Sequence, residues 1–297
     1  MDGAALLRLL LRLSRMDRRW IFLGMGLSIV LPLIFPVNFG FKVDERVQSL
    51  YDSVEALDAG DTVLISADFD PASRPELEPF FRANLEHLFR KDVKVVVLTL
   101  WDYAPPLVVP ILEEMAARHG KVYGTDYVFL GLKPGKELAI KAIGENIPKT
   151  FPTDSRGTPI GEIPVMQGFK QAKDFPLLIS VSAGFPGTRE YVLQIQGQYD
   201  LKMASACTAV SAPDYIPFYK AGQLVGLAGG MPGAAQYEKL VYPDGPPPGV
   251  RLLATQAINV LNLGHLYIIG LIVLGNITWL LARRIEGDAA PAAGGKR

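Results

Sequence analysis

The chain has 297 residues, of which 49% are hydrophobic and 20% charged, and its mean hydropathy is +0.21. This composition is too apolar for a typical soluble domain and too polar for a protein with many membrane spans, so we expect a few spans and one globular domain. The net charge is zero, but both ends are basic and the middle is acidic, which argues against a nucleic-acid partner. A single cysteine, Cys207, excludes internal disulfides and cysteine-rich metal sites.

The segment 1-19 combines arginines and leucines at three- and four-residue spacing. This pattern predicts a basic amphipathic helix on the cytoplasmic surface of an anionic membrane. An equal alternative is that the arginines only set the membrane topology. They are Arg8, Arg12, Arg15, Arg18 and Arg19.

Two uncharged apolar stretches, 20-37 and 261-282, predict transmembrane helices. A cleaved signal peptide is the alternative for the first stretch, but no small-x-small cleavage site follows Pro36, so we expect an uncleaved anchor. Basic residues precede the first stretch, and Arg283 and Arg284 follow the second in the tail 283-297. The positive-inside rule therefore predicts that both termini are cytoplasmic and that the intervening domain is on the far side of the inner membrane.

Small and polar residues in both predicted spans are candidates for helix packing. Small residues let helix backbones approach closely in lipid, and a lone asparagine is costly there, so it should face a helix partner in this chain or in another. The alternative is that the glycines are ordinary membrane-helix composition. The candidates are Gly24, Ser28, Gly270, Gly275 and Asn276.

The region 38-260 predicts an α/β domain. Apolar runs alternate with helical segments, and the run 93-101 is hydrophobic throughout, as expected of a strand buried on both faces. Strand and helix alternation favours right-handed crossovers, and we predict a doubly wound, mostly parallel, Rossmann-like sheet. A polar insertion rich in proline and glycine, 148-175, divides three units from three. A proline-rich stretch, 242-249, predicts an extended spacer before the second span.

Three junctions between a strand and a helix share a glycine followed by Pro-Gly, around Pro134, Pro186 and Pro232. We expect each proline to lie in the first turn of its helix, where its missing N–H costs nothing. Such junctions lie at the carboxyl ends of parallel strands, where α/β sheets bind ligands, so a small anion is a possible ligand. The simpler interpretation is that they are well-formed turns. The candidate ligand-binding residues are Gly184, Gly187, Gly230 and Gly233.

Three carboxylates, Asp68, Asp70 and Asp102, end the first two predicted strands and are weak candidates for acid–base chemistry or cation binding. Capping and turn roles are the favoured alternative. Ser182, Cys207, Thr208 and Ser211 lie at later strand ends, but no GxSxG elbow surrounds the serines. No pair of histidines has metal-ligand spacing, and no glycine-rich loop matches a nucleotide motif, so we predict no metal and no cofactor.

The sequence contains no complete catalytic constellation, which favours a non-catalytic protein. The leading hypothesis is a membrane-anchored subunit of a larger membrane assembly, in which the extracytoplasmic domain contacts itself or other membrane proteins. The first alternative is a tethered module that binds or senses a small ligand at the strand ends. The second is a membrane-anchored hydrolase or transferase that uses the strand-end aspartates.

Overall fold

The computed structural model describes residues 17–35 and 40–288. The chain divides into two compact units, and the larger, Gly40–Thr255, is called the sheet domain below. The other unit contains helix α2, Arg18–Ile34, and most of helix α12, Leu253–Asp288. The predicted amphipathic segment 1-19, with Arg8, Arg12 and Arg15, lies almost wholly outside the described residues.

The sheet domain contains a six-stranded sheet in which every pairing is parallel. The strand order is β3-β2-β1-β4-β5-β6, the order that Rossmann domains have. The predicted α/β class with a parallel sheet is therefore confirmed. The strands are β1 (Thr62–Asp68), β2 (Lys94–Thr99), β3 (Tyr127–Leu132), β4 (Leu178–Ser182), β5 (Met203–Cys207) and β6 (Gly226–Gly229).

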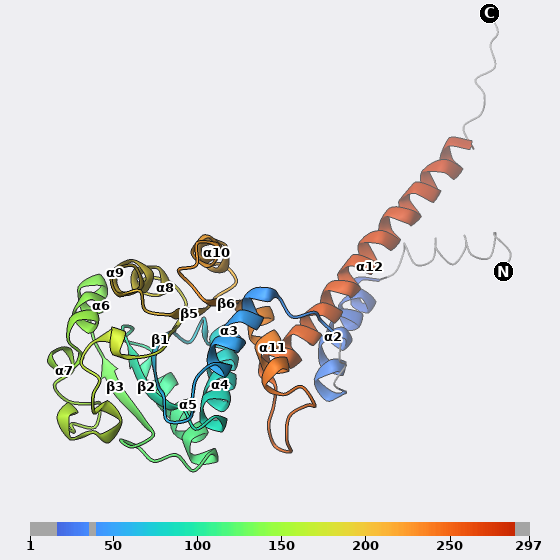
Figure 1. Ribbon diagram of the computed structural model, residues 1–297. Coiled ribbons are helices and arrows are strands. Elements are labelled where there is room, and N and C mark those ends of the chain that lie inside the picture. The colour runs from blue at the N-terminus through green and yellow to red at the C-terminus, as the bar shows by residue number, and fades with distance from the viewer. Residues whose placement is uncertain (1–16, 36–39, 289–297) are drawn as a thin grey trace, which may run out of the picture. The chain divides into compact units, whose positions relative to one another are not determined.

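Helices flank both faces of the sheet. In Figure 1, α3, α4, α5 and α11 gather on one side of the strands, and α6, α8, α9 and α10 on the other. Strands β1, β4 and β5 are buried along their whole length and β2 from its second residue onward, which is why apolar residues in these strands are continuous rather than alternating with exposed polar ones. The helices are α3 (Glu45–Glu55), α4 (Arg74–Arg90), α5 (Pro105–Arg118), α6 (Lys136–Glu145), α7 (Ile147–Thr150), α8 (Thr188–Tyr191), α9 (Gly197–Tyr199), α10 (Ala212–Lys220) and α11 (Gly230–Val241), with a π-helical stretch at Val192–Gln196.

The insertion 148-175 contains three short 3-10 helices, Ile160–Glu162, Pro164–Met166 and Ala172–Asp174. Its apolar side chains belong to the main hydrophobic core, in which Ile163, Met166 and Phe175 are buried. A segment without strands or long helices is thus held in place by a few anchoring side chains.

The three Pro-Gly junctions differ in structure, and our prediction of a shared turn was wrong for two of them. Helices α6 and α8 begin two residues after Pro134 and Pro186, so those prolines precede the helix. Helix α11 begins at Gly230 and includes Pro232 in its first turn, where the N–H groups have no intrahelical partner. A shared Pro-Gly pair is therefore compatible with different helix starts.

In the smaller unit, α2 and α12 contact each other at Gly24. The Tyr267 hydroxyl donates a hydrogen bond to the carbonyl of Ile21 at 2.9 Å, and a Cβ at position 24 would overlap that hydroxyl. Ser28 is buried and donates to the carbonyl of Met25 at 2.8 Å. Glycine at position 24 therefore permits a close helix contact.

Among the described residues, one helix is long and apolar enough to cross a membrane. It is the stretch Leu253–Leu281 of α12, whose most apolar window has a mean hydropathy of 1.9. It begins eight residues before the predicted span 261-282, because the residues from Leu253 onward are already helical. Helix α2, which covers most of the predicted span 20-37, has 17 described residues, at the lower limit of spanning lengths. The span 20-37 therefore remains a prediction.

Candidate functional site

Strands β1 and β4 are neighbours at the centre of the sheet, and the connections from them lead in opposite directions. In open parallel sheets, ligands bind in the crevice outside the carboxyl ends of such a strand pair. The candidate residues Asp68 and Ser182 end these two strands and are register partners. This edge of the sheet is therefore the first place to look for a site.

Asp68 is fully buried at the end of β1, and both oxygens of its carboxyl group accept hydrogen bonds from the protein itself. It accepts hydrogen bonds from Ser66 Oγ at 2.5 Å, from the Leu100 backbone N–H at 2.6 Å and from Thr99 Oγ1 at 3.2 Å. Burial raises the pKa of the carboxyl to about 7, although these hydrogen bonds lower it. Asp68 joins β1 to the end of β2 and has no exposed surface with which to reach a ligand.

The crevice itself is bridged by Trp101, which follows β2. Its indole N–H donates to the carbonyl of Pro186, after β4, at 2.8 Å. Because β1 lies between β2 and β4, this bond passes across the end of β1. Below it, Ser182 Oγ bonds with the backbone of Gly184, and its neighbour Ala183 donates to the carbonyl of Asp68 at 3.0 Å. At the position where Rossmann domains bind a dinucleotide, this chain's own groups therefore bond with one another across the strand ends.

The other two candidate carboxylates lie outside the sheet edge. Asp70 Oδ1 accepts from the N–H of Ser73 at 2.9 Å and from its hydroxyl at 2.7 Å, which is the turn role weighed against a catalytic one. These bonds from Ser73 lower the pKa of Asp70. Asp102 is exposed. Asp68 is buried and bonded, Asp70 stabilises a turn, and Asp102 faces solvent, so the arrangement does not favour a shared acid–base pair. No cluster of three His, Cys, Asp or Glu side chains suited to a metal occurs in the part of the chain that the structure describes.

The four candidate glycines fall in two separate places. Gly184 lines a cleft of about 590 Å³ formed by the segments that follow β4 and β5, together with Phe185, Arg189, Ser211, Asp214 and other residues of those segments. Next to it, the Gly187 N–H already donates to Glu190 Oε2 at 2.8 Å, and a Cβ at Gly187 would overlap Ser182 Oγ. This N–H is therefore not free for an anion.

Gly230 and Gly233 allow α11 to lie close to its neighbouring segments. A Cβ at Gly233 would lie 2.8 Å from the carbonyl carbon of Ala228, and one at Gly230 would lie 2.7 Å from the Cβ of Ala209. Gly233 also lines a cavity of about 160 Å³ beside Asp44 and Arg46, whose side chains are paired with each other. Close packing explains both glycines without a ligand.

The candidate nucleophiles at later strand ends show no activating partner. Cys207 is buried, and burial raises the pKa of its thiol to about 12, so it is protonated at neutral pH. Thr208 Oγ1 and Ser211 Oγ lie 3.1 Å apart and bond with each other rather than with a histidine.

A buried polar cluster on the opposite face of the sheet joins α3, α4 and α11. His87 Nδ1 lies 2.9 Å from the Tyr237 hydroxyl and His87 Nε2 lies 2.9 Å from Glu55 Oε1, while Tyr51 stacks on the imidazole ring. Asn84 also donates to the Tyr237 hydroxyl at 3.1 Å. Tyr237 is completely buried, and the cluster ties three helices together.

The residue after Tyr237 connects the sheet domain to helix α12. Glu238 is buried, and its carboxylate accepts from the N–H of Ala254 at 3.0 Å, from the N–H of Thr255 at 2.8 Å and from the Thr255 hydroxyl at 2.7 Å. Burial raises the pKa of this carboxyl. The first N–H groups of a helix have no intrahelical partner, so a glutamate from α11 caps the beginning of α12.

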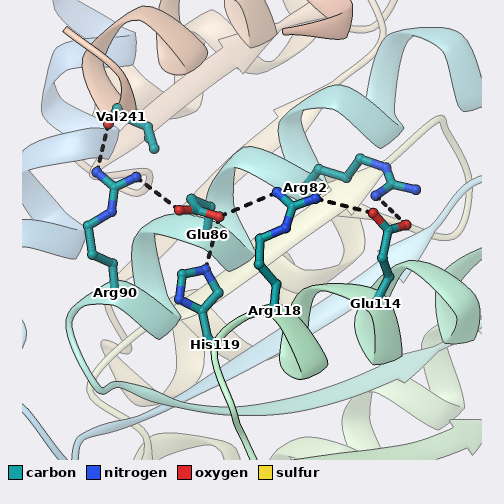
Figure 2. Close-up of polar contacts among 7 residues, drawn as sticks. All are labelled: Arg82, Glu86, Arg90, Glu114, Arg118, His119 and Val241. Carbon is teal, nitrogen blue, oxygen red and sulfur yellow. Dashed lines mark hydrogen bonds and ion pairs between the residues drawn. The ribbon is translucent and has the colours of Figure 1, made fainter. Parts of the chain in front are cut away.

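A network of charged side chains on α4, on α5 and directly after α5 contacts the end of α11, as Figure 2 shows. Glu86 binds His119 Nε2 at 2.9 Å and Arg90 at 3.0 Å, and Arg90 also donates to the carbonyl of Val241 at 2.8 Å. Burial would raise the pKa of Glu86, but the bonds from His119 and Arg90 outweigh it and the pKa is lowered. This network fixes the end of α11, directly before the proline-rich stretch.

The same network continues to Arg118 and Arg82. Arg82 donates to Glu114 Oε2 at 2.8 Å, whereas Arg118 lies 3.4 Å from Glu114 and 3.8 Å from Glu86. Both arginines line a cavity of about 250 Å³ together with the segment Gly249–Leu253, which leads into α12. Our sequence reasoning missed this cavity, although the Glu and Arg residues spaced four apart on both helices were a visible signal.

Fold and site together define an α/β protein with a six-stranded parallel sheet and one apolar helix long enough to cross a membrane. No protein family, curated protein or solved structure matches the chain.

Proposed function

We propose that this chain is a non-catalytic, membrane-anchored subunit of a larger membrane assembly, in which the Rossmann-like domain makes protein contacts on the extracytoplasmic side. The observation that carries the proposal is that Glu238 of the sheet domain caps the start of the apolar helix α12. In the same domain, the polar groups Asp68 and Trp101 at the strand ends form hydrogen bonds within the chain. A domain joined in this way to an apolar helix is expected to act close to the bilayer, and the bonded strand-end groups favour a role in protein contacts over catalysis.

The proposed topology has two spans, α2 and the apolar part of α12, with both termini in the cytoplasm. It rests on the arginines that flank both spans, among them Arg18, Arg19 and Arg283 in the described residues. The apolar side chains of both helices support it, because Phe22, Leu33 and Ile269 are more than half exposed, as expected of groups that face lipid.

A surface for helix partners is available on α12. Gly270 and Gly275 have no other part of the described chain within reach of a Cβ, and the Asn276 side chain is exposed, with its amide donating to the carbonyl of Ile272 at 2.8 Å. In lipid, glycines permit close helix approach, and an asparagine carbonyl without a hydrogen-bond donor is energetically unfavourable. A helix from another chain satisfies both requirements.

Blue-native electrophoresis of gently solubilised membranes tests the proposal. We expect the protein to migrate well above the 32.4 kDa of one chain, and Asn276→Leu to shift part of it towards that mass. Leu266→Ile, an apolar exchange on the same helix, is the control and leaves the migration unchanged. Migration of the wild-type protein as a lone chain contradicts the proposal.

The second candidate function is a tethered module that binds a small ligand, and the 590 Å³ cleft at the ends of β4 and β5 favours it. A thermal-shift screen with anions, nucleotides and small metabolites tests this function. A ligand whose stabilisation disappears in Arg189→Gln supports it, since Arg189 is an exposed residue of that cleft. Gly187→Val is unsuitable as a test because its side chain would overlap Ser182.

A further inference from the structure

The cavity that leads into α12 has an arginine-rich lining. Three guanidinium groups line it, those of Arg82, Arg118 and Arg251, against two carboxylates, Glu114 and Glu238. The Glu238 carboxylate is occupied by the N–H groups and hydroxyl at the start of α12. Glu114 is shared by Arg82 and Arg118. Among the lining residues, guanidinium groups therefore outnumber carboxylates by three to two, and of the three arginines Arg82 and Arg118 also contact Glu78 and Glu86 outside the lining.

Several guanidinium N–H groups in the cavity are free to donate. Arg82 uses its Nε and Nη1 groups, on Glu78 and Glu114, which leaves Nη2. The contacts of Arg118, at 3.4 and 3.8 Å, are longer than good charged hydrogen bonds. No hydrogen bond or ion pair reaches Arg251 within residues 17–35 and 40–288. A guanidinium carries five N–H donors in a planar fork, a geometry suited to phosphate oxygens.

The position of the cavity in the sequence links it to the membrane. Its lining includes the five consecutive residues Gly249–Leu253, and Leu253 is the first residue of the helix that is able to cross a membrane. At about 250 Å³ the cavity is at the small end of ligand sites, enough for a headgroup but too small for acyl chains. The cavity is therefore adjacent in sequence to the apolar helix.

We propose that this cavity binds the phosphate of an anionic phospholipid headgroup, in the leaflet that the sheet domain faces. Arg118 and Arg251 donate to the phosphate oxygens, and Arg82 adds positive charge from the α4 side. The proposal rests on the membrane anchoring stated above. It adds a lipid preference that anchoring alone does not require, because an apolar helix has no selectivity for headgroup charge.

Native mass spectrometry of the delipidated full-length protein tests the site, with phosphatidylglycerol and phosphatidylcholine of identical acyl chains at equal concentration. We expect preferential retention of phosphatidylglycerol. Each of Arg251→Gln and Arg118→Gln should weaken its retention about fivefold, the effect of roughly 1 kcal/mol for one arginine at an anionic lipid surface. Lys202→Gln, at an exposed basic residue directly before β5, is the control and retains the lipid like the wild type.

Arg251→Gln decides the test if Arg118→Gln fails to fold, because Arg118 also contacts Glu86 and Glu114. Equal retention of both lipids, or unchanged retention by Arg251→Gln, overturns the proposal. Displacement of phosphatidylglycerol by millimolar inorganic phosphate also overturns it, since the site would then take a soluble anion.

An alkaline carbonate wash of reconstituted vesicles separates this proposal from the proposed function. Protein that remains in the vesicles without a lipid preference leaves the anchoring intact and removes the headgroup site. Protein that the wash extracts removes the anchoring itself.

Discussion

Asp68 places an ionisable group where neither water nor a cation compensates its charge. The pKa of its carboxyl is about 7 in the folded protein, against 3.8 for the unperturbed group. Between these two values the folded protein keeps a proton that the unfolded chain releases. The stabilisation from the protonated form is therefore complete below pH 4 and is lost as the pH rises through 7, by up to about 4 kcal/mol.

The variant Asp68→Asn is expected to remove this pH dependence. Its side chain still accepts from Leu100 N–H but cannot ionise, so the melting temperature of the variant should gain on the wild type as the pH rises from 5 to 8. Thermal unfolding of the full chain in mild detergent measures the difference. The control is Asp70→Asn. Hydrogen bonds from Ser73 lower the pKa of Asp70, so the difference in melting temperature between this variant and the wild type should stay constant from pH 5 to 8. Parallel curves for Asp68→Asn and wild type contradict the prediction.

Two tyrosines at matching offsets from their Pro-Gly junctions, Tyr191 and Tyr237, are both fully buried. The Tyr191 hydroxyl donates to Ser66 Oγ at 2.8 Å, whereas the Tyr237 hydroxyl bonds with both His87 and Asn84. Removing a hydroxyl leaves its partners buried and unpaired, at about 1–3 kcal/mol for each group. We predict that Tyr237→Phe lowers the melting temperature more than Tyr191→Phe, and equal losses would refute this.

At the scale of elements, helix α3 packs against the edge strand β6 through a glycine. A Cβ at Gly226 would overlap the backbone of Leu50, so α3 has to move when any side chain is placed there. We predict that Gly226→Ala destabilises the sheet domain by about 3 kcal/mol or more, typical of overpacking against backbone. The control is Gly161→Ala, where a Cβ meets nothing within 4 Å. Thermal unfolding compares them, and equal melting temperatures would show that α3 adapts easily.

The link between α11 and α12 depends on one carboxylate. Glu238→Ala removes the acceptor of three hydrogen bonds at the first turn of α12, a loss of roughly 1–3 kcal/mol in local stability. We predict that trypsin then cuts after Arg251 about tenfold faster in the full-length protein, while the sheet domain resists as before. Limited proteolysis followed by mass spectrometry measures this rate. Glu145→Ala, at an exposed glutamate of α6, should leave it unchanged, and an unaltered rate in Glu238→Ala would remove the capping role.

At the scale of the whole molecule, the single cysteine makes the chain a background for topology mapping. Cys207 is buried and its thiol has a pKa of about 12, so we predict that a maleimide labels it only after denaturation. With this silent background, Gly168→Cys in the exposed part of the insertion should react with an impermeant maleimide in intact cells if the domain is extracytoplasmic. Labelling of Gly168→Cys only after the cells are opened contradicts the proposed topology.

The sequence predicted the secondary structure well because its signals are local. The continuous apolar run 93-101 depends only on neighbouring residues, and strand β2 occurs within it, as expected. Of the three predicted strand-end aspartates, only Asp68 lies at the carboxyl end of a strand, β1. Its contacts were beyond prediction: the Leu100 N–H that reaches Asp68 comes from the residue directly after β2, 32 positions along the chain.

By itself, the sequence determined the α/β class, the parallel sheet and the apolar C-terminal helix. Strands that are buried on both faces and a helix that is apolar enough to cross a membrane both require continuous runs of apolar residues. Only the tertiary structure decided which groups meet. Trp101 reaches Pro186 because β1 lies between their strands, and Glu238 caps α12 because α11 folds back on α4. Such contacts depend on strand order and helix packing, which no local pattern encodes, and they decide where a ligand is able to bind.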